Sequence, residues 1–137
     1  MAQIVNASAL WTDGERFLCS ATSGHAFIVD ADRERNTAPG PMELVLVGLC
    51  VCTGTDVASI LNKKREKFTT LLVRAEGRRA EKPPTVYEHI KLIYTVSKSV
   101  QPKSMEDAVH LSKDKYCSVS QMLSKTAQME AEIEYVE

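Results

Sequence analysis

Four cysteines carry the most reactive side chains in this 137-residue chain. Cys50 and Cys52 stand in the apolar stretch LVLVGLCVCTGTDV, residues 44–57, whereas Cys19 and Cys117 lie far from it in the sequence. A thiolate can attack an electrophile, bind a soft metal or form a disulfide. Because the chain starts without a basic and apolar secretion signal, we expect a reducing, cytoplasmic location in which the thiols are not permanently bridged.

The spacing of the cysteines separates their expected roles. Cys50 and Cys52 are two residues apart, which on a helix turns their side chains about 200° from each other. Only one of them can face a given partner, so the pair is a poor metal site. Cys117 directly precedes Ser118, the expected N-cap of a short helix. Unpaired N–H groups and the helix dipole there predict a lowered thiol pKa at Cys117.

A reactive Cys52 would need help from outside its own segment. Burial in apolar surroundings favours the neutral thiol, and Asp56, one helical turn further on, would repel a thiolate. A cation must therefore come from elsewhere in the fold. Arg16, Arg33 and Arg35 are the candidates, and all three lie outside the expected helix.

Hydrophobic periodicity and turn residues define the elements that must position these groups. The expected strands cover residues 3–10, 16–21, 25–31, 68–79, 85–98 and 129–137. The expected helices cover residues 41–64, 104–116 and 118–127, the last two starting at capping patterns led by Ser104 and Ser118. The strand at 129–137 has alternating glutamates, which is typical of an edge strand with one solvated face.

This order, βββ-α-ββ-αα-β, predicts one α+β domain over residues 1–137. The first half of the helix at 41–64 is apolar on every side, so other structure must enclose it. We therefore expect a sheet wrapped around a buried central helix. A chain of this size does not cover such a helix on all sides, and association into a homodimer is the simplest remedy.

Composition limits the classes of partner. Hydrophobic residues make up 44% and charged residues 26%, with a formal net charge of -1. This balance favours neither nucleic acid nor an anionic membrane surface as a partner. The apolar run Leu44–Cys52 is too short to cross a bilayer. His25, His89 and His110 are scattered over different elements, and no phosphate-binding glycine loop occurs, so we predict no metal and no cofactor.

Two segments together resemble the OsmC/Ohr family of thiol-dependent peroxidases. They are PMELVLVGLCVCTGTDVASIL (41–61) and KYCSVSQML (115–123), and the order of elements extends the resemblance to nearly the whole chain. By position, Cys52 resembles the peroxide-reacting cysteine of the family and Cys117 the resolving cysteine, while Cys50 has no family counterpart. The resemblance implies reduction of an organic hydroperoxide by Cys52, a disulfide with Cys117, and reduction by an external dithiol. It also implies an intertwined homodimer with active sites at the subunit interface.

The supporting groups of the family site are placed differently here. Family peroxidases have a glutamate directly after the proline that begins the helix, but this chain has Met42 there and Glu43 one residue later, turned about 100°. The family arginine comes from the amino-terminal hairpin, where Arg16 in TDGER is the nearest candidate. The predicted site therefore consists of Cys52 and Cys117, with Arg16 and Glu43 as supporting groups.

Two functions are compatible with these residues. The first is a hydroperoxide reductase that takes part in oxidative-stress defence. The alternative is a non-enzymatic OsmC-like dimer that binds a small apolar ligand or senses oxidation. The enzyme requires Cys52 and Cys117 within disulfide reach and an arginine near Cys52, whereas the alternative allows the two thiols to lie apart.

Overall fold

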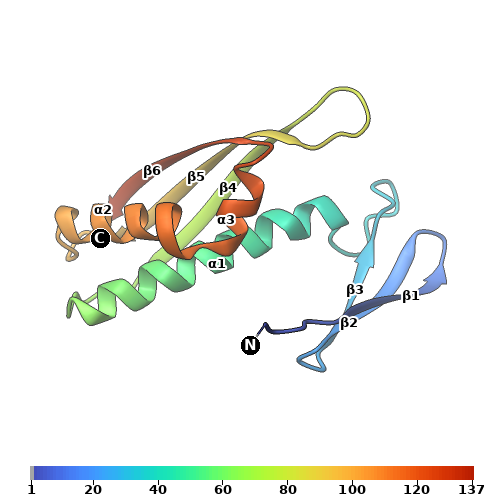
Figure 1. Ribbon diagram of the computed structural model, residues 1–137, viewed down its shortest axis with the longest axis horizontal. Helices are drawn as coiled ribbons and strands as arrows, with labels where there is room; N and C mark the ends of the chain where they lie inside the picture. Colours follow the sequence, from blue (N-terminus) through green and yellow to red (C-terminus); the bar gives the residue numbers. More distant parts are fainter. Residues whose placement is uncertain (1) are drawn as a thin grey trace. The chain divides into compact units, whose positions relative to one another are not determined.

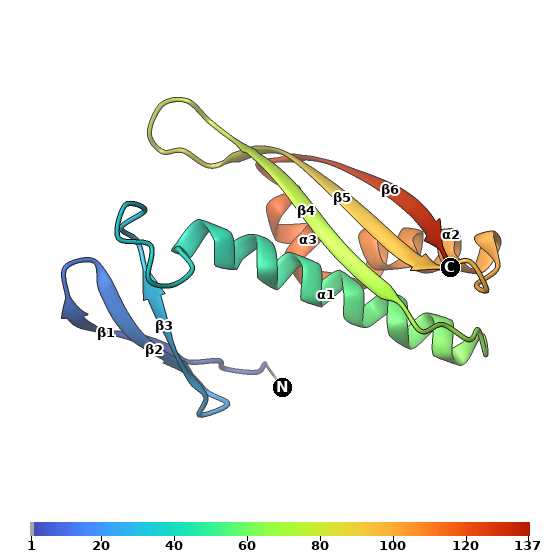
Figure 2. The same ribbon diagram turned by 180° about the vertical axis from the view of Figure 1, so that it is seen from behind.

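The computed structural model describes residues 2–137 and confirms the predicted α+β class (Figures 1 and 2). The strands are β1 (Ala7–Asp13), β2 (Arg16–Ala21), β3 (Ala26–Asp30), β4 (Leu71–Arg79), β5 (Tyr87–Ser97) and β6 (Gln128–Val136). The helices are α1 (Pro41–Lys63), α2 (Pro102–Leu111), the π-helical turn η1 (Ser112–Tyr116) and α3 (Ser118–Leu123). The predicted order of elements is therefore observed, with a π turn inserted between the two last helices.

The strands form two three-stranded sheets, and the chain divides into two compact units. The first unit contains the described residues up to Val45, and the second is Leu46–Glu137. Each unit is described by itself below.

The first unit is an antiparallel sheet in the order β1-β2-β3, followed by a loop and the first residues of α1. Trp11 pairs with Phe17, and Cys19 pairs with Phe27. β1 is exposed along its whole length, and exposed apolar side chains include Trp11 (61%) and Phe27 (48%). A thin sheet with apolar side chains open to water lacks the cover that such sheets normally have.

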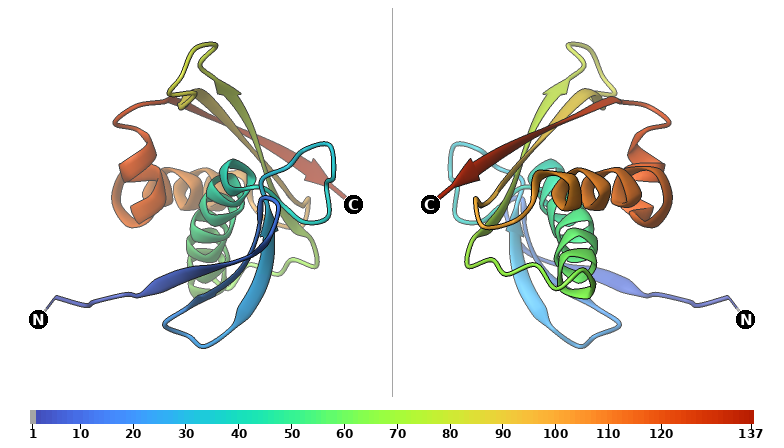
Figure 3. Two further views of the ribbon diagram at one scale, coloured as in Figure 1. Left: turned by 90° about the vertical axis from the view of Figure 1, so that its right-hand side faces the viewer. Right: turned by 90° about the vertical axis from the view of Figure 1, so that its left-hand side faces the viewer.

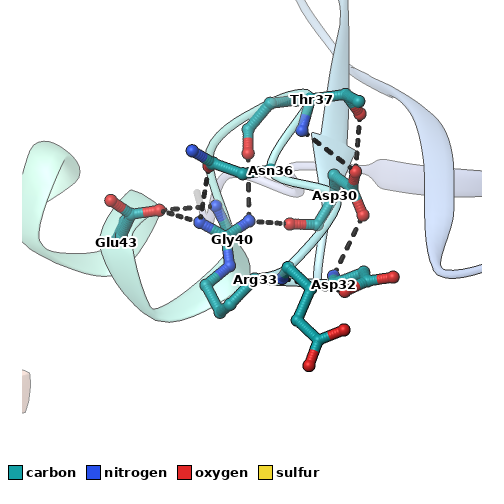
Figure 4. Close-up of polar contacts among 9 residues, drawn as sticks. Asp30, Asp32, Arg33, Asn36, Thr37, Gly40 and Glu43 are labelled. Carbon is teal, nitrogen blue, oxygen red and sulfur yellow. Dashed lines mark hydrogen bonds and ion pairs between the residues drawn. The ribbon is translucent and has the colours of Figure 1, made fainter.

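A buried carboxylate organises the loop that follows β3. Asp30 is fully buried, and its carboxylate accepts hydrogen bonds from Asp32 N at 3.0 Å, Thr37 N at 3.2 Å and Thr37 Oγ1 at 2.5 Å (Figure 4). The hydroxyl of Thr37 is the main cause that lowers the pKa of Asp30, and burial opposes it. These bonds fix the approach of the chain to the start of α1.

The second unit packs three helices against one face of the sheet β4-β5-β6 (Figures 1 and 3). β5 is the central strand; β4 pairs with it antiparallel and β6 parallel. The inner face of β5 is buried, and its outer face carries the partly exposed His89, Lys91 and Thr95 beside the buried Ile93. The buried inner residues are Ile90, Leu92, Tyr94 and Val96.

Ion pairs cover the outer face of the same sheet. His89 lies 3.1 Å from Glu130, and Lys91 lies 2.7 Å from Glu132. Each pair is diagonal: the glutamate on β6 lies two residues beyond the residue directly opposite, because His89 is opposite Gln128 and Lys91 is opposite Glu130. The alternating glutamates of the last strand therefore form the predicted solvated face of an edge strand.

α1 buries one stripe of residues at intervals of four. Leu49, Thr53, Val57 and Leu61 are fully buried, and the helix ends at Lys63. α1 contains an 18-residue window of mean hydropathy 2.0, so by length and composition alone it qualifies as a membrane-crossing helix, a criterion that core helices of soluble proteins also meet. The sequence prediction considered only the shorter run Leu44–Cys52.

The first predicted cap of the carboxyl-terminal helices is wrong. α2 begins at Pro102 with Gln101 as N-cap, because proline fits the first turn of a helix. Ser104 instead donates a hydrogen bond from Oγ to Glu66 Oε2 at 2.7 Å. At the other end, Cys117 N bonds to Ser112 O at 2.8 Å, which closes the wide turn η1.

Candidate functional site

The structure brings the side chains of Cys52 and Cys117 together. Cys52 lies half-buried in the middle of α1, and Cys117 is fully buried between η1 and α3. Both thiols are free, and Cys52 lies near enough to Cys117 to raise the pKa of the Cys117 thiol. Two residues that are distant in sequence therefore form a thiol pair within the second unit.

Cys117 is itself the N-cap of α3, rather than the residue before it. Its Sγ accepts a hydrogen bond from Ser120 N at 3.3 Å, which satisfies one of the free N–H groups of the first turn. The predicted capping position at Ser118 is therefore wrong by one residue. Backbone φ and ψ of -78° and 103° at Cys117 turn its side chain back over the helix start.

Burial overturns the predicted direction of the pKa shift at Cys117. Burial raises the pKa above the ordinary 9.0, and the interactions with Cys52 raise it further. Hydrogen bonds with Ser120 lower it, but the net shift is upward.

Cys50 faces the opposite flank of α1, as its spacing from Cys52 requires. It borders a hollow of about 400 Å³ whose other walls include Leu71 and Val73 of β4. Burial raises the pKa of the Cys50 thiol. Cys19 lies in β2 of the first unit and is partly buried.

Glu43 anchors the start of α1. Its Oε1 accepts hydrogen bonds from Gly40 N and from Arg33 Nη1, both at 2.9 Å (Figure 4). Arg33 also donates to the carbonyl oxygens of Asp30 and Ala38. Glu43 therefore caps its own helix and binds a guanidinium group.

Arg16, the other predicted supporting residue, begins β2. Its Nε is buried and has no hydrogen-bond partner among residues 2–137. The action of Arg16 and of Glu43 on Cys52 stays a prediction.

Sequence reasoning missed a chain of buried hydroxyl groups beside the thiol pair. Thr53 Oγ1 lies 2.7 Å from Tyr94 OH and 2.8 Å from Ser112 Oγ, and Ser112 Oγ donates to Asp56 Oδ2 at 2.9 Å. An unpaired buried hydroxyl would cost about 1–3 kcal/mol, so these groups satisfy one another. The available signal was Thr53 itself, a polar residue in the middle of an apolar stripe.

The described residues contain no candidate metal site. No group of three or more His, Cys, Asp or Glu side chains in the described part of the chain, residues 2–137, is arranged to hold an ion. The chemistry that these contacts suggest is therefore that of the thiols themselves.

Comparison with known proteins agrees with this arrangement. The family model described as OsmC-like protein matches residues 34–132. Protein YhfA of Escherichia coli strain K12 is 35% identical over 133 residues, which cover 96% of this chain and 98% of YhfA.

Solved structures share the fold over the full length. An OsmC-like protein from Mycoplasma pneumoniae has a TM-score of 0.86 at 15% identity and covers all of both chains. An organic hydroperoxide resistance protein OsmC from Legionella pneumophila has a TM-score of 0.72 at 15% identity and covers 98% of both chains. With the matched family model, the relative at 35% identity and the paired cysteines, the chain belongs to the OsmC-like family.

Proposed function

We propose that this protein is a thiol-dependent peroxidase that reduces organic hydroperoxides through Cys52 and Cys117. The observation that carries the proposal is that two free thiols, one on α1 and one at the start of α3, lie near each other within the second unit. The thiolate of Cys52 is the nucleophilic form in this proposal. Cys52 is also the less buried of the two thiols, so a substrate can reach it more easily.

The first step oxidises Cys52. Its thiolate attacks the terminal oxygen of the hydroperoxide, the O–O bond breaks, and Cys52 becomes a sulfenic acid. The departing alkoxide takes up one proton, equal to the proton that Cys52 released on forming its thiolate, and leaves as an alcohol. Two electrons pass from sulfur to the peroxide.

The second and third steps restore the thiols. Cys117 attacks the sulfenic sulfur of Cys52, an S–S bond forms, and the thiol proton leaves with the hydroxyl group as water. An external dithiol then reduces this disulfide, supplying two electrons and two protons and becoming a disulfide itself. A reducing cytoplasm supplies such dithiols.

The working form in this proposal is a homodimer. Support comes from apolar side chains that a single chain leaves open in each unit: Leu10 (67%) and Trp11 (61%) on the first sheet, and Val47 (53%) and Val51 (62%) on α1. A soluble monomer rarely leaves so many apolar residues of one helix and one sheet exposed to water. A second copy of the chain would cover them.

A second candidate function has an observation of its own. The first unit has an apolar hollow of about 600 Å³, with Phe17, Phe27, Val29 and Leu44 among its walls. Its size and apolar lining suit a small apolar ligand. A non-enzymatic ligand-binding protein therefore stays the alternative.

Peroxide consumption separates the two functions. Wild-type protein is assayed with cumene hydroperoxide and dithiothreitol beside Cys52→Ser, Cys117→Ser and the matched control Cys50→Ser. We expect Cys52→Ser to lose at least a hundredfold in turnover and Cys50→Ser to stay within about twofold. Cys117→Ser should still reduce one equivalent of peroxide, because only the second step is removed. Equal, slow consumption by all four proteins would favour the ligand-binding alternative.

A further inference from the structure

A continuous chain of four buried or half-buried polar side chains crosses the core of the second unit. It runs from Tyr94 on β5 through Thr53 on α1 and Ser112 on η1 to Asp56 on α1. Tyr94, Thr53 and Ser112 are each at most 1% exposed. The three links measure 2.7, 2.8 and 2.9 Å, which is normal for O–H···O bonds.

The carboxylate at one end fixes the direction of every link. The ionised side chain of Asp56 only accepts, so Ser112 must spend its single hydroxyl proton on it. Ser112 Oγ then accepts from Thr53, and Thr53 Oγ1 accepts from Tyr94. All three protons therefore point the same way, and successive bonds of this kind polarise and strengthen one another.

Both cysteines, Cys52 and Cys117, are linked through the backbone to members of this series of hydrogen-bonded side chains. Thr53 directly follows Cys52, and Asp56 lies one helical turn further along α1. Ser112 opens the π turn that ends at Cys117, and its carbonyl oxygen accepts from Cys117 N at 2.8 Å. Ser112 thus holds α1 with its side chain and Cys117 with its backbone.

Apolar packing alone would not fix how Ser112 is placed against α1. Dispersion contacts are non-directional, whereas the Ser112 hydroxyl accepts from Thr53 and donates to Asp56, and these two bonds fix both the position and the rotation of Ser112 on α1. π turns are rare and concentrate at functional sites, and this one ends at a cysteine in contact with a second cysteine.

We propose that the chain Tyr94–Thr53–Ser112–Asp56 positions Cys117 against Cys52 and thereby sets the rate and equilibrium of their disulfide bond. Thr53 and Ser112 are positioning residues, since they act on Cys117 through the π turn. The biological use of this positioning role rests on the proposed peroxidase function. Disulfide formation itself is measured without any peroxide.

The test measures the Cys52–Cys117 disulfide in glutathione redox buffers. We expect Thr53→Val and Ser112→Ala to lower the equilibrium constant for the disulfide by about tenfold to a hundredfold, because small displacements of reacting groups have effects of this size. Thr53→Ser keeps the hydroxyl and should stay within about twofold of wild type. The matched control is Thr55→Val, on the same helix, whose hydroxyl bonds only to Val51 O of its own helix.

Kinetics give a second readout. With one equivalent of cumene hydroperoxide, Thr53→Val and Ser112→Ala should form the Cys52 sulfenic acid as fast as wild type but convert it to disulfide about tenfold more slowly. Dimedone would then trap the sulfenic acid. Tyr94→Phe removes only the last link, so it gives a smaller fall and serves where another variant does not fold.

The possible outcomes distinguish failure of the positioning role from failure of the peroxidase function. Unchanged equilibria and rates in Thr53→Val and Ser112→Ala overturn the positioning role, and so does a fall in Thr53→Ser equal to that in Thr53→Val. A wild-type protein that forms no disulfide in any buffer overturns it as well. If the equilibria shift as expected while wild type consumes no peroxide, the positioning role stands and the peroxidase function fails. Thermal stability is recorded throughout, because a merely structural role would lower it without moving the disulfide equilibrium of folded protein.

Discussion

Arg33 Nη1 and Glu43 Oε1 form an ion pair of 2.9 Å at the start of α1, and the same carboxylate oxygen accepts from Gly40 N. One side chain therefore acts both as helix cap and as the partner of a guanidinium group from the preceding loop. Because the pair is largely exposed, with 49% and 62% of the two side chains accessible, its Coulombic contribution is small. The hydrogen bond from Gly40 N, which caps the helix, therefore contributes more to stability than the ion pair does.

Removal of Glu43 should therefore lower stability modestly. We expect Glu43→Ala to reduce the free energy of unfolding by about 1 kcal/mol, which is the usual effect of losing a side-chain cap. Urea denaturation measures this loss. Glu34 is an exposed residue of the same loop that takes part in hydrogen bonding, among residues 2–137, through its backbone N–H and not its side chain. Glu34→Ala is therefore the control and should change stability by less than about 0.5 kcal/mol. Equal losses in both variants would contradict the capping role.

Arg16 is expected to assist the oxidation of Cys52. Loss of a cation beside a nucleophilic thiolate should lower the second-order rate constant for cumene hydroperoxide by about tenfold or more in Arg16→Ala, with partial recovery in Arg16→Lys. Stopped-flow kinetics of the reduced protein measure this step alone. Arg33→Ala is the comparison: a larger fall there than in Arg16→Ala would transfer the role to the arginine that Glu43 binds.

Alkylation with iodoacetamide should distinguish the thiols by pH. Burial raises the pKa of both Cys50 and Cys117 above the ordinary 9.0, so both are protonated at neutral pH and their labelling should increase only in more alkaline buffer. At pH 7 we expect the first adduct at Cys52 rather than at Cys117, because Cys52 is the less buried of the two. Peptide mass spectrometry locates each adduct. First labelling at Cys117 would contradict the assignment of Cys52 as the reactive thiol.

Asp30 should make the stability of the protein sensitive to acid. Hydrogen bonds, first of all from the Thr37 hydroxyl, lower its folded-state pKa below the ordinary 3.8. A carboxyl with a lowered pKa stabilises the fold above its unfolded-state value and loses this contribution as pH falls through the folded-state pKa. Wild-type unfolding temperature should therefore fall more steeply below pH 4 than that of Asp30→Asn. Glu81→Gln, an exposed residue, should follow wild type; parallel curves for all three proteins would contradict the prediction.

The exposed face of α1 should respond to charge if a second copy covers it. Val51 is 62% exposed in the single chain, so Val51→Glu causes little strain within one protomer. In a homodimer the same carboxylate is buried at the interface, and we expect dissociation to monomers at micromolar concentration. Sedimentation velocity measures the assembly state, with Lys125→Glu on an exposed turn as control. A monomeric wild-type protein would contradict the proposed dimer.

The sequence was sufficient for elements whose signal is local. Proline at position 41 and the apolar residues that follow define α1, and strict alternation defines the inner face of β5. The two family segments led to the prediction that Cys52 and Cys117 act together, and the structure places the two side chains near each other. The parallel pairing of β5 with β6 was not foreseen, because it joins strands separated by three helical segments.

Other features depend on burial, which no local pattern reveals. The position of Cys117 near a helix start predicted a lowered pKa, whereas the surrounding core removes water and raises it. The π turn was also missed, because its i to i−5 bond has no signature in hydrophobic periodicity. The bonds among Thr53, Ser112 and Tyr94 were not predicted, because they form only when α1, η1 and β5 are brought together.

The wide turn before Cys117 makes the length of this segment matter more than its composition. Lys113, Asp114, Lys115 and Tyr116 are all exposed, so substitutions there are easily accommodated. Loss or gain of one residue is not accommodated in this way, because each residue of a helix turns the chain by about 100°. A single-residue deletion in this solvent-facing stretch would rotate Cys117 and move its sulfur away from its buried position. An alignment of relatives should therefore show substitutions here but no gaps.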